Sequence, residues 1–381
     1  MTKNEDTKNI DNDILENIEK SLKKKGVNIE DIQKDEDFDA SLIEKAVPFQ
    51  IQYDDEDIEL VATTNEKELS KKKAKKVDIS QINIVDKNEL EKEKELKRAM
   101  FGNKAAFQIV AAQSGYMAKV LPLVHKDTVN LLYTNVDQYQ YKKMVYQTVW
   151  EKIYETSVGK MDFNTWLQRT SAEDLETFMY GIYCATFQNE GTFSFSCTNC
   201  GETSDFVVNN RNLIKVADSK KMQSLIEDIA KNAIDEKTME EFSIVGKTEA
   251  FELPDSKIIV EFRTPSLADI LSILKNVPEE TLARKQQNLI AASYTKRILI
   301  PAEKGGYIEI TDKERLLKML DGLTIDDSRE MQNTILERVN ENRITYSIKN
   351  IKCPHCGEVV KELPIVVEDI LFSLIFERTQ S

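Results

Sequence analysis

Four of the five cysteines lie in two copies of one short motif. The first copy reads Cys-Thr-Asn-Cys-Gly at 197–201, and the second reads Cys-Pro-His-Cys-Gly at 353–357. Two thiolates three residues apart can bind one metal ion from the same side, and the glycine lets the backbone turn back without a side-chain clash. Since zinc prefers four ligands in a tetrahedron, the motifs predict one Zn²⁺ site, bound by Cys197, Cys200, Cys353 and Cys356.

A site closed by four thiolates is structural. It has no open coordination position and therefore cannot activate water. Structural zinc contributes on the order of 10 kcal/mol to folding, and here it would join two motifs separated by residues 201–352. His355 lies inside the second motif, but four sulfurs already complete the tetrahedron, so we expect His355 to face solvent. Cys184, in the apolar stretch GIYCATF, is expected to be a small buried side chain.

Other uses of paired cysteines remain as alternatives. A thioredoxin-like redox pair sits at the start of a helix, whereas both pairs here are followed by glycine and then by strand-like residues. Four cysteines can also hold an iron–sulfur cluster, although nothing in the sequence indicates electron transfer. Disulfides within each pair require an oxidising compartment, and no export signal is visible.

The sequence shows no catalytic motif. His125 and His355 are the two histidines, and His125 is expected at the surface near a helix start. Neither a phosphate-binding Gly-x-x-x-x-Gly-Lys-Ser/Thr loop nor a Gly-x-Gly-x-x-Gly turn after a strand is present. The glycine pair in EKGGYIEI, residues 303–310, reads as a hairpin turn. We therefore predict a protein that is not an enzyme and has no small-molecule substrate or catalytic residues.

The elements around the two motifs predict an α+β fold. Apolar residues recur at helical spacing from 88 to 113 and in further segments. The aromatic residues of 141–187 follow helical spacing without interleaved arginine, so we expect them to form core rather than a base-stacking platform. We expect a mainly helical body, a four-cysteine zinc ribbon and a disordered N-terminal arm. The other predicted helices are 144–157, 162–187 with a start at Ser171, 219–242, 327–342 and 366–378. Residues 257–276 are predicted as strand, turn and helix, with Thr264 or Ser266 as the helix cap and Pro265 in the first turn. Residues 311–323 are predicted as a helix with Thr311 and Glu314 as its capping box.

Charge and composition divide the chain into three regions. Residues 1–87 form a charged arm, 88–190 a helical region, and 191–381 a zinc-ribbon and α/β region closed by a C-terminal helix. Arm segment 47–63 alternates apolar and polar residues, and we expect its Phe49, Ile51, Tyr53 and Leu60 to order on a partner. The lysine run at 71–78 is interpreted as a solvated linker.

The whole chain carries a net charge of −14, which disfavours sequence-independent binding to nucleic acid. No signal peptide and no membrane-spanning run is evident, so we expect a soluble protein that is made in a reducing cytoplasm and does not bind a membrane.

Three blocks of the sequence carry a family resemblance. They are DLETFMYGIYCATF…GTFSFSCTNCG…DFVV, KIIVEFRTPSLADIL and IKCPHCGEVVKELPIVVEDILFSLIF. Across residues 105–378 the pattern resembles the cysteine-knuckle baseplate hub and baseplate assembly proteins of contractile-tailed, T4-type bacteriophages. The resemblance implies a structural or assembly protein of the virion, made in the host cytoplasm, with other tail and baseplate proteins as partners. A zinc-ribbon nucleic-acid-binding or transcription-associated protein is the alternative, and a redox protein is a third.

Overall fold

The computed structural model describes residues 106–131, 136–187, 190–210, 213–278 and 286–371. These residues belong to one compact unit, of which 44% is helix and 28% is strand. The α+β class is therefore confirmed, while the expectation of a mainly helical body is not. No helix in the described ranges is long and apolar enough to cross a bilayer. The predicted arm, 1–87, and residues 372–378 of the predicted last helix lie outside the described residues.

A three-stranded antiparallel sheet begins the described chain. It consists of β1 (Phe107–Ala111), β2 (Tyr116–Val120) and β3 (Ile153–Thr156), in the order β1-β2-β3. The predicted helix 88–113 is wrong at residues 107–111, which form β1, and the predicted helix 144–157 is wrong at residues 153–156, which form β3. Gly115, with a φ of +79°, allows the tight turn from β1 to β2. Because both faces of β1 are covered, its sequence is a continuous apolar run without the alternation that indicates a strand.

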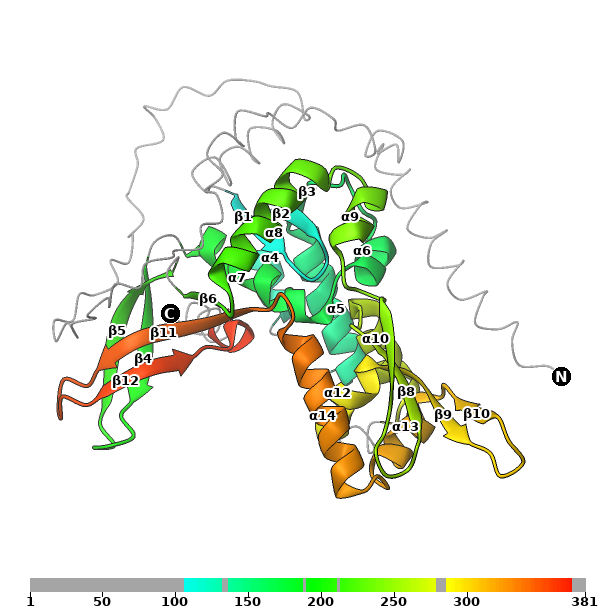
Figure 1. The fold of residues 1–381 in the computed structure, drawn as a ribbon. Coiled ribbons are helices and arrows are strands. Elements are labelled where there is room, and N and C mark those ends of the chain that lie inside the picture. The colour runs from blue at the N-terminus through cyan, green and yellow to red at the C-terminus, as the bar shows by residue number, and fades with distance from the viewer. Residues whose placement is uncertain (1–105, 132–135, 188–189, 211–212, 279–285, 372–381) are drawn as a thin grey trace, which may run out of the picture. The chain divides into compact units, whose positions relative to one another are not determined.

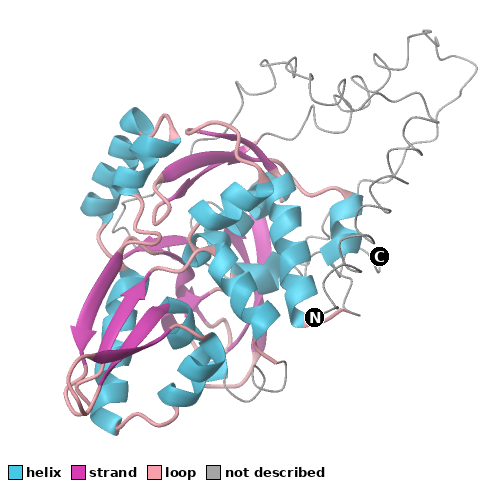
Figure 2. Cartoon of the chain, turned by 90° about the vertical axis from the view of Figure 1, so that its right-hand side faces the viewer, coloured by secondary structure: helices cyan, strands magenta, loops and turns pink. Residues whose placement is uncertain are grey.

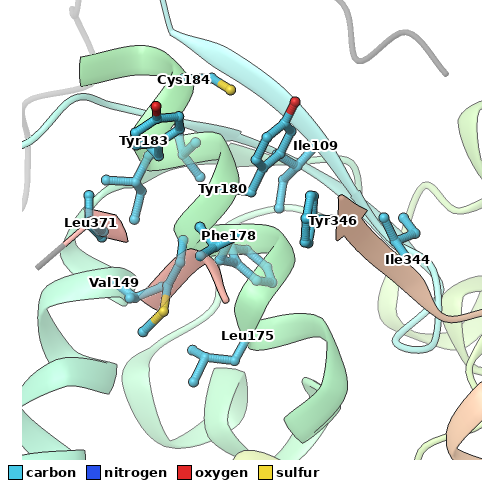
Figure 3. Packing of buried hydrophobic residues seen from close by; sticks show 14 of the residues in the cluster. Ile109, Val149, Leu175, Phe178, Tyr180, Tyr183, Cys184, Ile344, Tyr346 and Leu371 are labelled. Atoms are coloured by element: carbon cyan, nitrogen blue, oxygen red, sulfur yellow. The ribbon is translucent and has the colours of Figure 1, made fainter. Parts of the chain in front are cut away.

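Helices from the middle of the chain cover this sheet. They are α4 (His125–Leu131), α5 (Gln138–Glu151), α6 (Phe163–Arg169), the 3₁₀ turn η3 (Ala172–Asp174) and α7 (Leu175–Thr186). A Cβ on Gly181 of α7 would lie 2.4 Å from Ile109 of β1, so helix and sheet pack at very short range. The predicted aromatic core is confirmed in part. Trp166, Phe178 and Tyr180 are fully buried in this cluster, whereas Tyr141, Trp150 and Phe163 pack against it partly buried and Tyr154 is not among its residues. Figure 3 shows Phe178 and Tyr180.

A four-stranded antiparallel sheet anchors a second core. Its order is β10-β9-β8-β7, formed by β7 (Thr248–Glu252), β8 (Ile259–Arg263), β9 (Thr295–Pro301) and β10 (Tyr307–Ile310). The helices α10 (Leu267–Asn276), α12 (Gln286–Tyr294), α13 (Lys313–Leu320) and α14 (Ile325–Asn340) lie beside it (Figure 2). Buried side chains of β8 and of these helices form one apolar cluster. The predicted hairpin at 303–310 is confirmed by β9 and β10.

Helix ends in this part follow side-chain caps. Ser266 caps α10 in a capping box with Asp269, as one of the two predicted caps, while Pro265 precedes the cap instead of lying in the first turn. Asp312, and not Thr311, accepts the hydrogen bond from the N–H of Arg315 at the start of α13. The predicted helix 219–242 is two helices, α8 (Ser219–Asn232) and α9 (Glu236–Phe242), because Asp235 starts a new capped helix.

A buried polar network joins the first core to the second. The carboxylate of Asp174 accepts hydrogen bonds from the Ser114 N–H at 2.7 Å and the Ser114 hydroxyl at 2.6 Å. The Gln113 side chain donates to the carbonyls of Val339 and Glu341 at the end of α14, both at 3.0 Å. Burial raises the pKa of Asp174 to about 6, against the lowering effect of the Ser114 hydrogen bonds.

Candidate metal centre

Each cysteine motif forms the turn of a β-hairpin. β4 (Glu190–Ser196) pairs with β5 (Thr203–Asn209), and β11 (Ile344–Lys352) pairs with β12 (Val359–Pro364). β11 also pairs with the short β6 (Ile214–Val216). Figure 1 shows the two hairpins side by side, although 152 residues (201–352) separate the motifs in the chain.

The two turns have the same backbone structure. In the first, the Cys197 N–H donates to the Glu202 carbonyl at 2.9 Å, and the Gly201 N–H donates to the Cys197 carbonyl at 2.8 Å. In the second, the equivalent bonds from Cys353 and Gly357 measure 2.8 and 3.0 Å. The two glycines have φ values of +76° and +75°, a region that favours glycine. Sequence and backbone therefore repeat together over six residues, Cys-x-x-Cys-Gly-Glu.

The turns bring all four sulfurs together. The ligand atoms of Cys197, Cys200, Cys353 and Cys356 all lie within 4.8 Å of one another. Across the two hairpins, the Cys197 and Cys356 sulfurs are 3.7 Å apart, as are those of Cys200 and Cys353. Four sulfurs around one ion at about 2.3 Å span tetrahedron edges of about 3.8 Å. The donor set and its spacing thus fit one tetrahedral ion.

Burial differs between the members of each pair. Cys197 and Cys353 are each 2% exposed, whereas Cys200 and Cys356 are exposed. The first cysteine of each turn thereby contacts the hairpin core, and the second closes the site from the solvent side. None of the five cysteines forms a disulfide.

The electrostatics of the cluster favour a cation. The Glu358 backbone N–H donates to the Cys356 sulfur and lowers the pKa of that thiol to about 6. Cys200 receives an equivalent bond from the Glu202 backbone, which lowers its pKa, but partial desolvation by its neighbours and the three neighbouring sulfurs raise that pKa to about 12. The Cys200 thiol therefore stays protonated near neutral pH without a cation. A divalent cation would compensate the crowded charge and displace the remaining protons.

Aromatic side chains support the hairpins below the sulfurs. Phe195 of β4 and Phe206 of β5 are buried, with ring centroids 6.2 Å apart, and they belong to the same apolar cluster as Ile348 and Ile351 of β11. The outer face of the first hairpin is polar, where Ser196 and Thr203 form a hydrogen bond at 2.8 Å. The two hairpins thus share an apolar interior that holds the turns together at one end.

Two buried groups fix the hairpin bases to the body. The Asn210 side chain, which follows β5, accepts from the Tyr183 hydroxyl at 2.9 Å and donates to the Phe187 carbonyl at 2.7 Å. Tyr346 of β11 donates to Thr177 at 3.1 Å, and its ring centroid lies 4.5 Å from that of Tyr180 on α7 (Figure 3). Helix α7 therefore contacts the bases of both hairpins.

The geometry bears on the alternatives for the cysteines. Both motifs lie between strands, so neither has the helix start that activates a thioredoxin-like thiol. The shortest sulfur distances join different motifs, which fits one shared ion and not two separate redox pairs. An iron–sulfur cluster distributes its four cysteines over two or four iron atoms, so some of the sulfurs lie farther apart than they do around one ion.

The remaining predicted positions are where the sequence places them. His355 is exposed in the second turn, and His125 is exposed at the first residue of α4. Cys184 is 6% exposed, and its sulfur lies 3.7 Å from the Asn210 carbonyl. Sequence reasoning missed the roles of Asn210 and Asp174, whose partners are distant in the chain. In the sequence, the Ser-Gly pair at 114–115 is the signal that indicates a turn at the position where Asp174 binds.

Comparison with known protein families gives a match over most of this chain. A family model described as T4 bacteriophage base plate protein matches residues 113–370, a range that contains both hairpins and the second core. No curated protein and no solved structure matches the chain.

Proposed function

This chain belongs to the family of T4 bacteriophage base plate proteins, and from that premise we propose that it is a hub-region baseplate protein whose body is closed by structural zinc. As a member of that family it is a structural protein of a phage tail, and it interacts with other tail and baseplate proteins. The family match is the observation that carries this function. The placement in the hub and the identity of the metal are the proposed parts.

Zinc is the metal that suits the site best. Four thiolates in tetrahedral spacing select zinc or iron over calcium or magnesium, which prefer oxygen. Cys197, Cys200, Cys353 and Cys356 would hold the ion, which supplies a cross-link and no open position for a substrate. This closed donor set supports a non-enzymatic role.

The N-terminal arm is proposed as a docking segment for other tail proteins. Its charge and low apolar content are typical of segments that order on binding. Synthesis in the host cytoplasm, where thiols stay reduced, would leave all four cysteines available to the metal. The net charge of −14 and the structural family both disfavour the nucleic-acid-binding alternative.

Incorporation into tail particles tests the proposal. The tagged full-length protein is expressed during infection, and particles are purified at low and at high salt. We expect the protein to co-purify with tail components at both salt concentrations, with about one zinc per chain by elemental analysis. A chain that is absent from particles, or that instead binds DNA with an affinity falling steeply with salt, would refute the baseplate assignment.

A further inference from the structure

The edge strand β10 has one unpaired side within the part of the chain that the structure describes. It pairs with β9 alone, at the end of the order β10-β9-β8-β7. Next to this ladder, Ala302 donates to the Gly306 carbonyl at 3.1 Å, so by alternation Ile308 and Ile310 bond to β9. The backbone groups of Tyr307 and Glu309 therefore point away from the sheet, toward a position that a further strand can fill.

The side chains of β10 are unusually apolar for an exposed edge. Ile308 is 57% exposed and Tyr307 is 55% exposed. Ile308 lies opposite Ile300, and Ile310 lies opposite Ile298, which is 2% exposed. This apolar face of the sheet thus continues onto β10, where Ile308 is exposed. Figure 1 shows the β9–β10 hairpin at the end of this sheet. An exposed apolar edge of this kind readily pairs with another extended segment.

The opposite edge of the same sheet is different. In β7, the exposed positions are Thr248, Glu249, Ala250 and Glu252. Acidic side chains on an edge discourage the addition of a strand. Within this sheet, β10 is therefore the edge that suits an apolar strand.

The chain itself contains a segment with the matching pattern. Residues 47–53 read Val-Pro-Phe-Gln-Ile-Gln-Tyr, with apolar side chains at every second position, and they lie outside the described residues. Between this segment and Ala106, where the described chain starts, residues 54–105 can extend to about 170 Å. A compact body of this size has a radius of gyration of only about 19 Å, so the segment can reach any part of it.

We propose that residues 49–53 of the arm add as an antiparallel strand to the free edge of β10 in the same chain. In this register Ile51 lies opposite Ile308 and Phe49 lies opposite Ile310, which covers the exposed continuation of the apolar face. Pro48, which has no N–H to donate, falls beyond the end of β10. Attachment to the same chain favours this occupant through its high effective concentration.

Charge selects the antiparallel direction. Residues 54–57 are all acidic, and the antiparallel register places Asp55 opposite Lys304, an exposed residue in the turn before β10. A parallel strand would instead bring these acids to Asp312 at the far end of β10. The inference does not depend on the baseplate assignment, since both strand and edge belong to this chain.

Hydrogen–deuterium exchange on the zinc-loaded full-length protein tests the pairing. The arm variant Phe49→Lys/Ile51→Lys removes the two apolar contacts, and Ile29→Lys/Ile32→Lys is the matched control elsewhere in the arm. We expect the amides of Tyr307 and Glu309 to exchange at least about tenfold faster in the arm variant than in the wild type and the control. Reciprocally, Ile308→Lys should speed exchange in peptides covering residues 47–53.

Two results would overturn the proposal. Equal exchange of the β10 peptide in the wild type and the arm variant would show that residues 49–53 do not occupy this edge. Protection that increases with protein concentration would assign the edge to the arm of a second copy. The arm variants leave the described body unchanged, so exchange in β8 should match the wild type and serve as the internal reference.

Discussion

Replacing Cys200 by serine should open the metal site without disturbing the core. Cys200 is exposed, so the substitution removes a ligand and little packing. A bound ion would close the loop formed by residues 201–352. For a cross-link over a loop of this length, the chain-entropy relation gives about 5 kcal/mol of stabilisation. At about 2–4 °C per kcal/mol, the melting temperature should fall by roughly 10–20 °C.

Thermal unfolding combined with metal analysis measures this effect. Wild type, Cys200→Ser and Cys184→Ser are compared after zinc loading and after chelation. Cys184 lies outside the site, so Cys184→Ser should keep its zinc and respond to chelation as the wild type does. Cys200→Ser should lose tight zinc binding, and its melting temperature should be close to that of the chelated wild type. Melting temperatures of loaded and chelated wild type within about 2 °C of each other would refute the reasoning that the ion cross-links the fold.

Three further predictions concern buried polar groups and close packing. The pKa of Asp174 is raised from 3.8 to about 6. Its contribution to stability is therefore fully present below pH 4, and about 3 kcal/mol of stability is lost as pH rises through 6. Urea unfolding should show this pH dependence in the wild type and not in Asp174→Asn. Lys152→Met should lower the free energy of unfolding by about 3–5 kcal/mol, because it leaves the buried Asp127 carboxylate, which lies 2.5 Å from the Lys152 ammonium, without a cation. The double variant with Asp127→Asn should recover part of that loss. Equal stability of the single and double variants would contradict the pairing argument. Gly191→Ala should destabilise the protein by about 1–3 kcal/mol, since the new Cβ would lie 2.3 Å from the Tyr183 hydroxyl, and an unchanged melting temperature would contradict the close contact.

The sequence predicted those parts of the fold whose causes are local. The cysteine turns were recognisable because ligand spacing and a glycine with positive φ occur within five residues. The cap at Ser266 and the hairpin turn at 303–310 were predicted for the same reason. The meeting of the two motifs was inferred from the number of ligands that zinc takes, a chemical constraint that acts over any distance in sequence.

Non-local structure was harder to predict. The strand β1 was expected to be helical because it is buried on both faces, so its sequence lacks the alternation of a half-exposed strand. Asp174 bonds to Ser114, 60 residues earlier, and no pattern in the sequence pairs these positions. The role of Asn210 likewise depends on Tyr183 and Phe187, which reach it only after α7 and the first hairpin have packed.

The position of the second cysteine turn has a consequence for biosynthesis. Cys197 and Cys200 leave the ribosome long before Cys353 and Cys356, the last ligands to be translated. A nascent or prematurely terminated polypeptide therefore offers only half of the thiolates and cannot capture the ion tightly. Metal capture would thus occur only after translation has passed residue 356, and incomplete products would lack the cross-link and stay open to proteolysis.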